Sequence, residues 1–229
     1  MISLIGAPAS GKGYIAASLI KRLKDDYGFE ESDIAAISVG AMIRQELKSH
    51  TPLGQKLAAN MKEGGLAPDS IVNEMLSDTL ENIKAKILIL DGYPRTVGQV
   101  KEFDKLVAKY NSAVIFRDTP VDLILERVKN RRICEKCGKA HDIGDGACPC
   151  GGRLIKRKDD EVLPERLAEY EEMTKPAVIE LKNEGNNFSG MKGRPKGKKL
   201  PENFWKRMQS ICGDFFGNGE FGMLRYCRF

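Results

Sequence analysis

Short apolar runs alternate with helical patterns over the first 120 residues of the chain. The runs predict strands at Ile2–Ile5, Ile34–Val39, Ile87–Leu90 and Ala113–Phe116. The run at 87–90, Ile-Leu-Ile-Leu, is apolar on both faces, as in a buried strand of a parallel sheet. Strands that alternate with helices predict an α/β fold with a doubly wound sheet, whose ligands bind beyond the carboxyl ends of the strands.

The clearest helical pattern follows Ala67-Pro68-Asp69, which suits the start of a helix. Six apolar residues then mark one face at helical spacing: Ile71, Val72, Met75, Leu76, Leu80 and Ile83. A charged helical pattern runs from about Asp159 to Leu181. Nearer the C-terminus the pattern predicts only a final strand over residues 186–191 and a closing helix over residues 202–211, and it predicts no structure for the tail, residues 213–229.

The 229 residues are enough for one such domain with a small insert. No apolar run approaches the roughly 20 residues that a membrane-spanning helix needs. Met1 leads straight into the first predicted strand, so we expect no signal peptide, no membrane segment and a cytoplasmic location.

The net charge of +5 lies almost entirely in one short segment. Five cations account for it: Lys192, Arg194, Lys196, Lys198 and Lys199. A protein that coats nucleic acid usually has a broader basic surface. A solvated lysine-rich loop is therefore favoured over a polyanion-binding tail, and we expect no nucleic-acid partner.

A glycine-bounded loop joins the first predicted strand to the first helical pattern. Residues 6–13 read Gly-Ala-Pro-Ala-Ser-Gly-Lys-Gly, which fits the G-x-x-x-x-G-K phosphate-binding frame with Gly13 where most such loops carry Ser or Thr. Gly6 and Gly11 permit backbone angles that turn successive N–H groups inward to cradle oxygens. The next helix directs the positive end of its dipole at the same point, and Lys12 adds a mobile charge. The order of strand, loop and helix favours a phosphate-binding loop over a chance surface turn.

A second motif, Asp91-Gly-Tyr-Pro-Arg95-Thr96, follows the buried strand at 87–90. A carboxylate at Asp91, opposite a phosphate loop, suits a magnesium ion bound through its water shell. Gly92 and Pro94 predict a turn that projects Arg95 into the cleft, where its planar guanidinium matches phosphate oxygens. Alone, the motif would indicate only a turn with an exposed arginine. Together with the loop it favours a nucleotide site.

Further arginines are spaced as ligands of an anion. Arg127 and Arg131 lie one helical turn apart on one face, where two like charges cost about 0.2–0.5 kcal/mol in an isolated helix. An anion between them would explain this spacing, although a solvated basic face stays open as an alternative. Arg157 ends the cysteine-rich segment and Arg166 lies on the following helix. Closure of a mobile element would then bring Arg157 onto a transferring phosphoryl group.

Four of the six cysteines fall within residues 134–150. In a reducing compartment such a cluster indicates metal ligation rather than disulfides. Cys134-x2-Cys137 is a strong half-site for zinc, whereas Cys148-x-Cys150 is one residue shorter than the usual second half. The tighter turn could force one ligand out, and His141 or a water would then replace it. Structural zinc is favoured over a metal-free lid and over redox-active cysteines.

In their order along the chain, these motifs resemble those of adenylate kinases. The matching segments are residues 6–13, 38–44 (Ser-Val-Gly-Ala-Met-Ile-Arg), 65–69 (Gly-Leu-Ala-Pro-Asp), 91–96 with Gln99, Arg127 with Arg131 and Arg132, and 157–160 with Arg166. The resemblance covers residues 1 to about 183 and is to the adenylate kinases whose long lid carries zinc. It implies the reversible reaction of Mg-ATP with AMP to give two ADP. It also implies a P-loop doubly wound sheet of five parallel strands, with helices on both faces and a small inserted lid.

The same resemblance assigns roles to the candidate residues. For ATP it implies Ala9, Ser10, Gly11, Lys12, Gly13, Tyr14, Arg127, Arg131, His141 and Gly190. For AMP it implies Val39, Arg44, Gly65, Leu66, Ala67, Gly92, Tyr93, Pro94, Arg95, Gln99, Arg157 and Arg166, with Gln99 reading the Watson–Crick edge of adenine. The groups expected to act on the transferring phosphoryl are Lys12, Arg95, Arg131, Arg157 and Arg166, with Mg²⁺ held at Asp91 through water. The expected zinc ligands are Cys134, Cys137, Cys148 and Cys150.

The resemblance further implies three parts in a monomer that binds ATP, AMP and ADP. The core would comprise residues 1–39, 71–131 and 158–212, the AMP-binding arm residues 40–70, and the zinc-type lid residues 132–157. No dedicated base is needed, because phosphoryl transfer between nucleotides depends on placement and on neutralising charge. A lid matters because water would otherwise take the phosphoryl group.

Three residues depart from the family pattern. Tyr14 and Val39 stand where the family has Thr, and Ala9 stands where Gly is usual. Alanine at position 9 is tolerable as long as its φ stays negative. Val39 has no hydroxyl to offer the AMP base. A net hydrogen bond from that hydroxyl would be worth about 0.5–1.5 kcal/mol, so its absence would weaken AMP binding by about tenfold at most.

Three other interpretations stay open. A pyrimidine or guanylate monophosphate kinase shares the loop and the Asp91 motif, but the long cysteine lid and Gln99 disfavour it. An RNA-binding protein would use the zinc knuckle and the basic run, and its binding would depend steeply on salt. A nucleotide-binding scaffold without turnover is suggested by Tyr14 and the unusual tail, and ADP formation that depends on Lys12 would exclude it.

Overall fold

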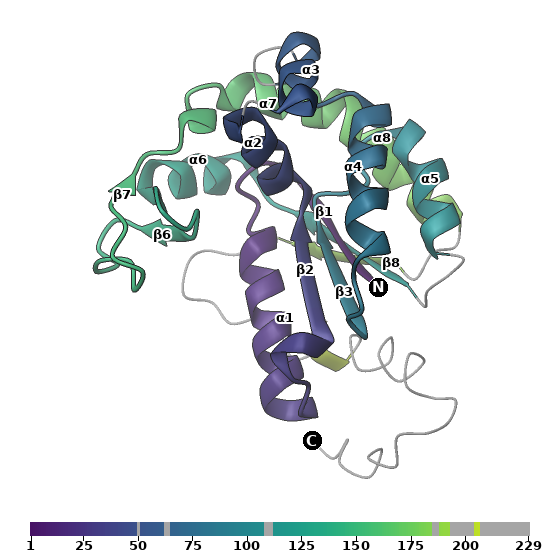
Figure 1. Cartoon of the computed structure of the whole chain (residues 1–229), viewed down its shortest axis with the longest axis horizontal. Helices are drawn as coiled ribbons and strands as arrows, with labels where there is room; N and C mark the ends of the chain where they lie inside the picture. The colour runs from purple at the N-terminus through teal and green to yellow at the C-terminus, as the bar shows by residue number, and fades with distance from the viewer. Residues whose placement is uncertain (50, 62–64, 108–111, 185–187, 193–203, 207–229) are drawn as a thin grey trace.

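The fold is built on one sheet of five parallel strands with helices around it (Figure 1). The computed structural model describes residues 1–49, 51–61, 65–107, 112–184, 188–192 and 204–206. The strand order is β2-β3-β1-β4-β8. Their bounds are β1 Ile2–Gly6, β2 Ile34–Ser38, β3 Ile87–Asp91, β4 Ala113–Asp118 and β8 Phe188–Lys192. The predicted P-loop α/β fold is confirmed, and each of the four apolar runs forms a strand.

The register of the sheet places two sequence motifs side by side. Strand β1 is central and pairs with β3 and β4, which explains why all three are apolar on both faces. Asp91, the last residue of β3, is level with Leu4 of β1 and with Ser38 of β2. The loop after β1 and the turn after β3 therefore leave the same edge of the sheet, where ligands of doubly wound folds bind.

Eight α-helices are described, along with shorter helical segments. Their bounds are α1 Lys12–Tyr27, α2 Val39–Ser49, α3 Pro52–Asn60, α4 Asp69–Glu81, α5 Val97–Val107, α6 Val121–Asn130, α7 Leu163–Glu169 and α8 Lys175–Asn183. Turns of 3₁₀ helix occupy Glu31–Asp33 and Lys158–Asp160, and a π-helical segment, Tyr170–Thr174, joins α7 to α8. Helix α4 buries Ile71, Val72, Met75 and Leu76, as its predicted apolar face requires.

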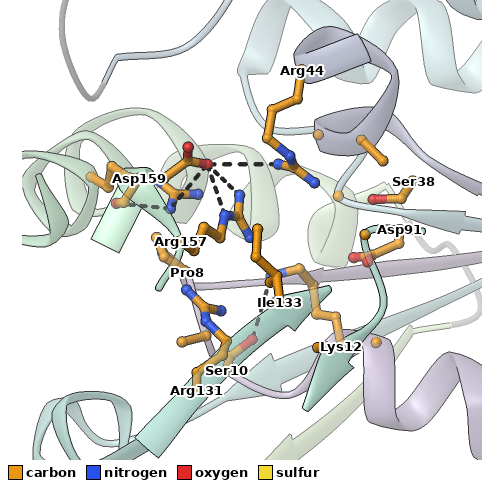
Figure 2. A pocket seen from close by; sticks show the side chains of 18 of the residues that line it. Pro8, Ser10, Lys12, Ser38, Arg44, Asp91, Arg131, Ile133, Arg157 and Asp159 are labelled. Carbon is orange, nitrogen blue, oxygen red and sulfur yellow. Dashed lines mark hydrogen bonds and ion pairs between the residues drawn. The ribbon is translucent and has the colours of Figure 1, made fainter. Parts of the chain in front are cut away.

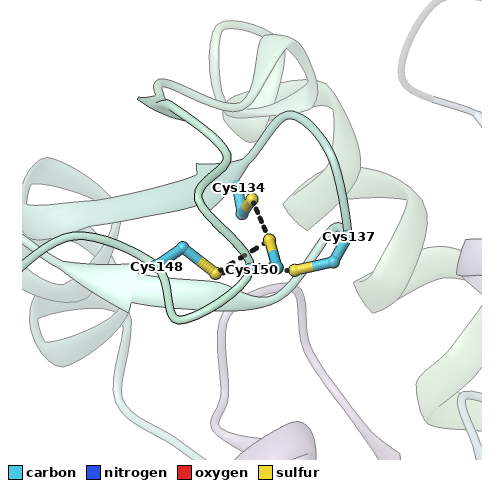
Figure 3. A group of neighbouring side chains, drawn as sticks. All are labelled: Cys134, Cys137, Cys148 and Cys150. Atoms are coloured by element: carbon cyan, nitrogen blue, oxygen red, sulfur yellow. Dashed lines mark hydrogen bonds between the residues drawn. The ribbon is translucent and has the colours of Figure 1, made fainter.

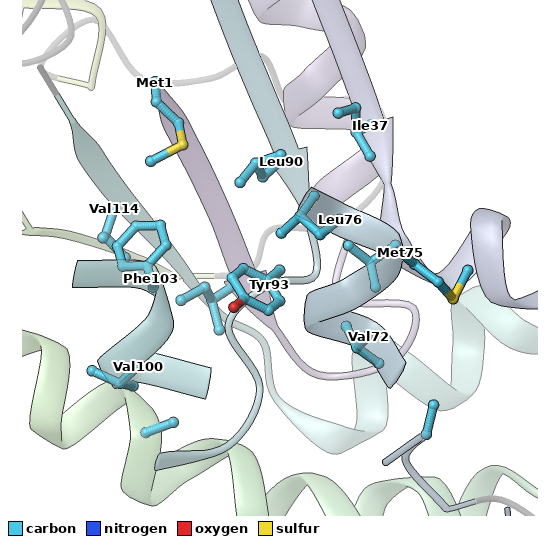
Figure 4. Packing of buried hydrophobic residues seen from close by; sticks show 14 of the residues in the cluster. Met1, Ile37, Val72, Met75, Leu76, Leu90, Tyr93, Val100, Phe103 and Val114 are labelled. Carbon is cyan, nitrogen blue, oxygen red and sulfur yellow. The ribbon is translucent and has the colours of Figure 1, made fainter. Parts of the chain in front are cut away.

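Apolar side chains form a separate core on each face of the sheet. Leu88 and Leu90 of β3 point to one face and pack with α4, α5 and α8. Figure 4 shows Leu90 there with Leu76 of α4 and Phe103 of α5. Ile89 points to the other face, where it joins Ile15, Leu19 and Leu23 of α1 and the buried Phe204. This alternation confirms helices on both faces, as the period of two along a strand requires.

Residues 131–155 form a smaller antiparallel sheet of their own. Strand β5 (Arg131–Cys134) lies between β6 (Ala140–Asp142) and β7 (Leu154–Ile155). In Figure 1, β6 and β7 lie beyond α6, away from the main sheet. We call residues 131–157 the cysteine insert from here on.

Two predicted element boundaries are wrong. The charged pattern from Asp159 does not start a helix, because residues 158–160 form a 3₁₀ turn and α7 begins at Leu163. Pro164 lies in the first turn of α7, where its missing N–H costs nothing. Val39 begins α2 rather than ending β2.

Some predicted features lie outside the described residues. These are the tail 213–229, the closing helix 202–211 apart from residues 204–206, and all of the basic run except Lys192. Of the predicted final strand, residues 188–191 belong to β8. None of the helices within the described ranges combines the length and apolar character needed to cross a membrane.

Candidate functional site

A cleft of about 1360 Å³ is lined by the phosphate loop, the start of α2, the turn after β3, α6, the cysteine insert and α7. It brings together twenty of the residues predicted to bind nucleotide or magnesium. They are Ala9, Ser10, Gly11, Lys12, Gly13, Tyr14, Val39, Arg44, Gly65, Leu66, Ala67, Asp91, Gly92, Arg95, Gln99, Arg127, Arg131, His141, Arg157 and Arg166. This volume exceeds the roughly 300–1,000 Å³ of most ligand clefts, as a site for two nucleotides would.

Three predicted residues are not among those that line the cleft. Tyr93 and Pro94 are buried, and the Tyr93 hydroxyl donates to the side chain of Asn73 at 2.8 Å. Gly190 lies exposed in β8, opposite Phe116. Tyr93 and Pro94 therefore shape the turn before Arg95 without offering side chains to the cleft.

The Lys12 side chain folds back over the phosphate loop and hydrogen-bonds to its backbone. Nζ of Lys12 donates to the carbonyl oxygens of Gly6 and Ala7, each at 2.8 Å. Gly11 precedes α1 in the left-handed region, with φ of 97°, and no side chain caps this helix start. The first N–H groups of α1 thus lack an intrahelical partner and face the position that an anion would take.

The charge of Lys12 is disfavoured in the ligand-free cleft. Burial lowers the pKa of Lys12 from 10.5 to about 8, and the charges of Arg95, Arg166 and Arg157 act in the same direction. Asp91 opposes the shift without cancelling it. A cation in such surroundings gains more from an anionic ligand than an exposed one would.

Ala9 adopts the left-handed conformation, with φ of 54°. The negative φ that would make alanine tolerable at this position is therefore not adopted. The N–H of Ser10 donates to the carbonyl of Ala7 at 3.2 Å, which closes a tight turn with Pro8 and Ala9 at its centre. A turn with Pro second and a positive φ third is of type II, and its third position usually requires glycine. For alanine the conformation costs about 1–2 kcal/mol.

We expect Ala9→Gly to raise the free energy of unfolding by about 0.5–1 kcal/mol. Relief of the left-handed strain exceeds the roughly 0.4–1 kcal/mol that glycine costs through the freedom of the unfolded chain. The midpoint of urea unfolding measures the change. Ala17→Gly, at an exposed position of α1, is the matched control and should lose about 1 kcal/mol. Equal losses in both variants would contradict the interpretation of Ala9.

Asp159 gathers arginine side chains from three segments of the chain (Figure 2). Its carboxylate pairs with Arg157, and it lies 3.7 Å from Nη1 of Arg44 in α2 and 3.7 Å from Nη1 of Arg166 in α7. The adjacent Asp160 forms a two-point ion pair with Arg131. Asp159 thus occupies, among guanidinium groups, the kind of place that suits a phosphate group.

The pKa values around Asp159 show an excess of positive charge. Burial, and next the charge of Arg157, lower the pKa of Arg44 and of Arg166 to about 10 each. Burial raises the pKa of Asp159, but Arg157, Arg166 and Arg44 outweigh it and the net shift is downward. One carboxylate therefore neutralises these three cations only in part, and an anionic ligand would complete the balance.

Two glycines make room for Arg95. Its Nε donates to the carbonyl of Gly92 at 2.8 Å, and Gly92 has φ of 83°. A Cβ at position 92 would lie 2.5 Å from Nη2 of Arg95, so the guanidinium can fold over the turn only above a glycine. A Cβ at Gly40 would lie 3.2 Å from Nη1 of Arg44 and 3.5 Å from Nη2 of Arg95. The two guanidinium groups therefore approach the same side of the cleft.

A polar network fixes the amide of Gln99. Its Nε2 donates to Asp69 at 2.8 Å, and its Oε1 accepts from the Arg95 N–H at 2.8 Å. Asp69 also accepts from the Thr96 hydroxyl at 2.6 Å. One N–H and one lone pair of Gln99 stay available to a ligand. Asp69 and Thr96 fall within motifs identified in the sequence, but the sequence alone assigned neither residue a role in the site.

The segment at residues 65–67 is tied to α7. Glu169 accepts the N–H of Leu66 at its Oε1, at 3.2 Å, across 103 residues of sequence. Glu169 also lines the cleft. Sequence reasoning missed this residue, and no local signal distinguishes it from the other glutamates of a charged helix.

His141 lies in β6 at the wall of the cleft. Its Nε2 is buried, and it is the one buried side-chain nitrogen or oxygen in the described ranges without a hydrogen-bond partner. A buried polar atom of this kind costs about 1–3 kcal/mol. A polar group of a ligand in the cleft would satisfy it.

The four cysteines of the insert lie together (Figure 3). Their Sγ atoms are all within 4.8 Å of one another, with 3.4 Å from Cys150 to both Cys134 and Cys148. These separations exceed the roughly 2.05 Å of a disulfide. They approach the ~3.8 Å between sulfurs of a tetrahedral zinc site with Zn–S of about 2.3 Å. All four are positioned to hold a metal ion, so the short second half forces no cysteine out, and His141 is not in the group.

The cysteine cluster has a charge conflict that a cation would remove. Hydrogen bonds from the Cys137 backbone lower the pKa of Cys134 to about 6. The backbone of Gly152 lowers the pKa of Cys150, but the neighbouring thiols outweigh it and raise this pKa to about 12. Gly152 is also sterically required, because a Cβ there would lie 2.3 Å from Sγ of Cys134. The donor set is therefore that of a closed thiolate site for a divalent cation.

Comparison with known proteins agrees with this geometry. A family model described as adenylate kinase matches residues 4–186. An adenylate kinase of Clostridium tetani is 35% identical over 215 residues, which cover 88% of this chain and 95% of that protein. One from Thermosipho africanus is 36% identical over 202 residues, covering 82% and 90% of the two chains. One from a Thermoanaerobacter species is 33% identical over 226 residues, covering 93% and 98%.

Proposed function

The chain belongs to the adenylate kinase family, and on that premise we propose how the side chains of its cleft are divided between two nucleotides. It is a phosphotransferase, and its reaction is the reversible transfer of the terminal phosphoryl group from Mg-ATP to AMP, which gives two ADP. The observation that carries the proposal is the Asp159 cluster, which gathers cations from α2, the end of the cysteine insert and α7 within reach of the phosphate loop.

The ATP half lies along the phosphate loop. Residues 9–14 and the start of α1 would hold the β- and γ-phosphates, with Lys12 on the group that is transferred. Arg127 and Arg131 would flank the nucleotide from α6 and β5, and His141 would meet it from the insert, where its unpartnered Nε2 favours contact with a polar group. Gly190 stays a proposed backbone contact.

The AMP half lies between α2, residues 65–67 and the turn after β3. Arg44, Arg95 and Arg166 would bind its phosphate, and Gln99 would read its base with the N–H and lone pair that Asp69 and Arg95 leave available. Leu66 and Ala67 would offer backbone to the base, beside Val39 and Gly65. Residues 40–70 would then be the AMP-binding arm and residues 132–157 the lid.

The transfer itself needs no base from the protein. An oxygen of the AMP phosphate attacks the γ-phosphorus in line, the bond from that phosphorus to the β–γ bridging oxygen breaks, and the bridging oxygen leaves on ADP. Lys12, Arg95, Arg131, Arg157 and Arg166 would stabilise the charge on the transferring oxygens. Asp91, at the carboxyl end of β3, would bind Mg²⁺ through water, and Mg²⁺ when bound neutralises phosphate charge.

The assignment of the acceptor is tested by ADP formation from ATP with AMP, GMP, UMP or CMP. AMP should be the preferred acceptor by 10²-fold or more, because Gln99 hydrogen-bonds a specific base edge. A preference for UMP would replace the assignment with that of a pyrimidine nucleotide kinase.

We propose that the cysteine cluster holds structural zinc, one ion per chain. Chelation under conditions that keep the thiols reduced should release this ion and cost at least about 2 kcal/mol of folding free energy. Each kcal/mol shifts the unfolding temperature of a chain this size by about 2–4 °C, so that temperature should fall by at least about 4–8 °C. Metal analysis and thermal unfolding of the same sample measure both effects. Cys150→Ser should lose zinc, whereas Cys212→Ser, at a cysteine 62 positions further along the sequence, should keep it. Retention of zinc by Cys150→Ser would leave only three cysteines as ligands.

ATP binding should be coupled to proton uptake near pH 8.5. The pKa of Lys12 is about 8 before ATP binds, so at pH 8.5 the Lys12 amine is neutral in most molecules. Phosphate charge raises the pKa again, and up to about three quarters of a proton would then be taken up per ATP. Calorimetry in buffers of different ionisation enthalpy measures this uptake, which should vanish in Lys12→Met and at pH 6.5. Uptake that persists in Lys12→Met would assign the proton to another group.

A cytoplasmic, monomeric enzyme without a nucleic-acid partner is part of the same proposal. Reduced thiols at the cysteine cluster suit such a compartment. Light scattering during gel filtration would test the monomer, with the mass of one chain as the expected result.

A further inference from the structure

The carbonyl oxygen of Ser10 in the phosphate loop accepts hydrogen bonds from three side chains. The donors are Nε of Arg117 at 3.3 Å, the Thr119 hydroxyl at 3.0 Å and Nη1 of Arg127 at 2.6 Å. A carbonyl oxygen has two lone pairs, so three donors fully satisfy its capacity to accept hydrogen bonds. Arg117 and Thr119 lie at and just beyond the carboxyl end of β4, and the sequence patterns point to neither of them.

Both residues are rigidly placed. Arg117 is 4% exposed and Thr119 is 7% exposed, while Ser10 is fully buried. Nη1 of Arg117 also donates to the carbonyl of Lys192 at the end of β8, at 2.9 Å. Arg117 packs against the start of the loop as well, because its carbonyl oxygen and its Cβ lie 2.5 and 3.1 Å from where a Cβ on Gly6 would be. The loop is thus anchored from β4 and, through Arg117, from β8.

The local sequence does not fix the peptide that this carbonyl belongs to. The peptide between Ser10 and Gly11 is followed by left-handed Gly11, and left-handed Ala9 precedes Ser10. Glycine takes either sign of φ at little cost, so this peptide can rotate between two orientations. In a trans peptide the C=O and the N–H point in opposite directions. A carbonyl held by β4 therefore directs the N–H of Gly11 to the other side.

From this geometry we propose that Arg117 and Thr119 are positioning residues for ATP, which hold the Ser10–Gly11 peptide with its N–H directed at the phosphates. The inference rests on the proposed function of the phosphate loop. Arg127 is the third donor to Ser10, but the same proposal places Arg127 on the bound nucleotide. When ATP draws Arg127 away, Arg117 and Thr119 keep the carbonyl in place.

The test compares the effects of substitutions on KM for ATP and on KM for AMP. Thr119→Val is nearly isosteric and removes only the hydroxyl, so the fold should survive. We expect its KM for ATP to rise about three- to tenfold, the worth of one net hydrogen bond, with KM for AMP unchanged. Thr119→Ser keeps the hydroxyl and should restore KM for ATP. Arg117→Met removes a charged donor and should raise KM for ATP about tenfold or more.

Matched controls make the result decisive. Thr79→Val removes a hydroxyl that donates to the Met75 carbonyl within α4, so it makes the same chemical change away from the loop, and both KM values should stay as in the wild type. A purely structural role for Thr119 would shift the unfolding midpoint without a difference between the two KM values. That result, or equal kinetics for Thr119→Val and Thr119→Ser, would overturn the proposal.

Direct titration with ATP in the absence of AMP provides a readout independent of turnover. If the wild-type protein formed no ADP at all, the proposed function would fail first, whereas active wild type with unaltered Thr119→Val would defeat only the positioning role.

Discussion

Lys12→Met should lower kcat for ADP formation by about 10³-fold and leave the fold intact. Removing one preorganised charge or donor from a transition state typically costs 10²–10³ in rate, and Lys12 supplies both a full charge and its hydrogen bonds. Among the described residues, its ammonium contacts only neutral oxygens, namely two loop carbonyls and the Ser10 hydroxyl. Methionine keeps the length of the side chain without its charge.

The stability of Lys12→Met should change in a direction that depends on pH. Because burial holds the pKa of Lys12 near 8 in the fold, below the 10.5 of an exposed lysine, the charge destabilises the folded state fully below pH 8. This cost is lost as pH rises from 8 to 10.5, since only the unfolded chain then carries the extra proton. Relative to the wild type, Lys12→Met should gain most at pH 7 and least above pH 10.5, as urea unfolding at the two pH values can measure.

Lys21→Met is the control for Lys12→Met. Lys21 lies on the same helix, exposed and paired with Asp25 one turn later, and an exposed pair of this kind contributes little to stability. Its activity should equal that of the wild type. A Lys12→Met enzyme with more than a tenth of the wild-type kcat would show that the charge is not needed in the transition state. The family assignment would survive that outcome, but the role given to the loop would not.

The parts of the site that the sequence predicts are those whose chemistry lies in consecutive residues. The phosphate loop and the Asp91 motif each follow a buried apolar strand, and parallel strands bring their carboxyl ends to one edge. The pattern of four short apolar runs is therefore enough to place Lys12 near Asp91. The cysteine spacing works in the same way, because Cys134 and Cys137 share one turn.

The parts that the sequence does not predict depend on interactions between distant segments. Asp159 pairs with Arg44, 115 positions away, and Glu169 holds Leu66 across 103 positions. The motif at 157–160 contains Asp159 but does not reveal its partners, and Glu169 does not differ locally from the other glutamates of a charged helix. The predicted helix also starts too early, at Asp159. Periodicity alone does not show that the Asp159 carboxylate pairs with arginines from other segments.

Ala9 illustrates a different limit. Residue type predicts a negative φ there, yet Ala9 adopts a φ of 54° within the hydrogen-bonded turn from Ala7 to Ser10. Pro8 indicates a turn, but proline at the second position suits type I and type II turns alike, so it does not predict the sign of φ at Ala9. Residue preference is weaker than the closure of a loop around Lys12, and the loop accepts the strain.

Arg95→Met should lower kcat/KM for AMP by about 10³-fold while KM for ATP stays nearly constant. The other arginines of the cleft already contact carboxylates that neutralise them at least in part. Arg44, Arg157 and Arg166 contact Asp159, and Arg131 pairs with Asp160. Arg95 forms no ion pair within the described part of the chain, and its Nε instead donates to the Gly92 carbonyl. Burial lowers the pKa of Arg95, and Asp91 opposes this shift. The buried charge therefore carries a desolvation cost that contact with a phosphate would offset. A cation that gives up no partner on binding its ligand contributes its full attraction, and arginine contacts to transferring phosphoryl groups are worth 10³–10⁵ in rate.

Two further variants decide whether the loss at Arg95 is one of charge or of geometry. Arg95→Lys keeps the charge but loses the planar fork, and we expect it to recover no more than about a tenth of the lost kcat/KM. Gly92→Ala keeps the arginine but places a Cβ 2.5 Å from its Nη2, in a backbone conformation that strains alanine, and should also act mainly on AMP. Arg153→Met, at an exposed arginine of the cysteine insert paired with Glu135, should change the kinetic constants of neither substrate.

If Arg95→Met raised KM for both nucleotides alike, Arg95 would be supporting the cleft as a whole. In that case the AMP phosphate would have to be held by Arg44 and Arg166 in competition with Asp159, and Asp159→Asn would then tighten AMP binding.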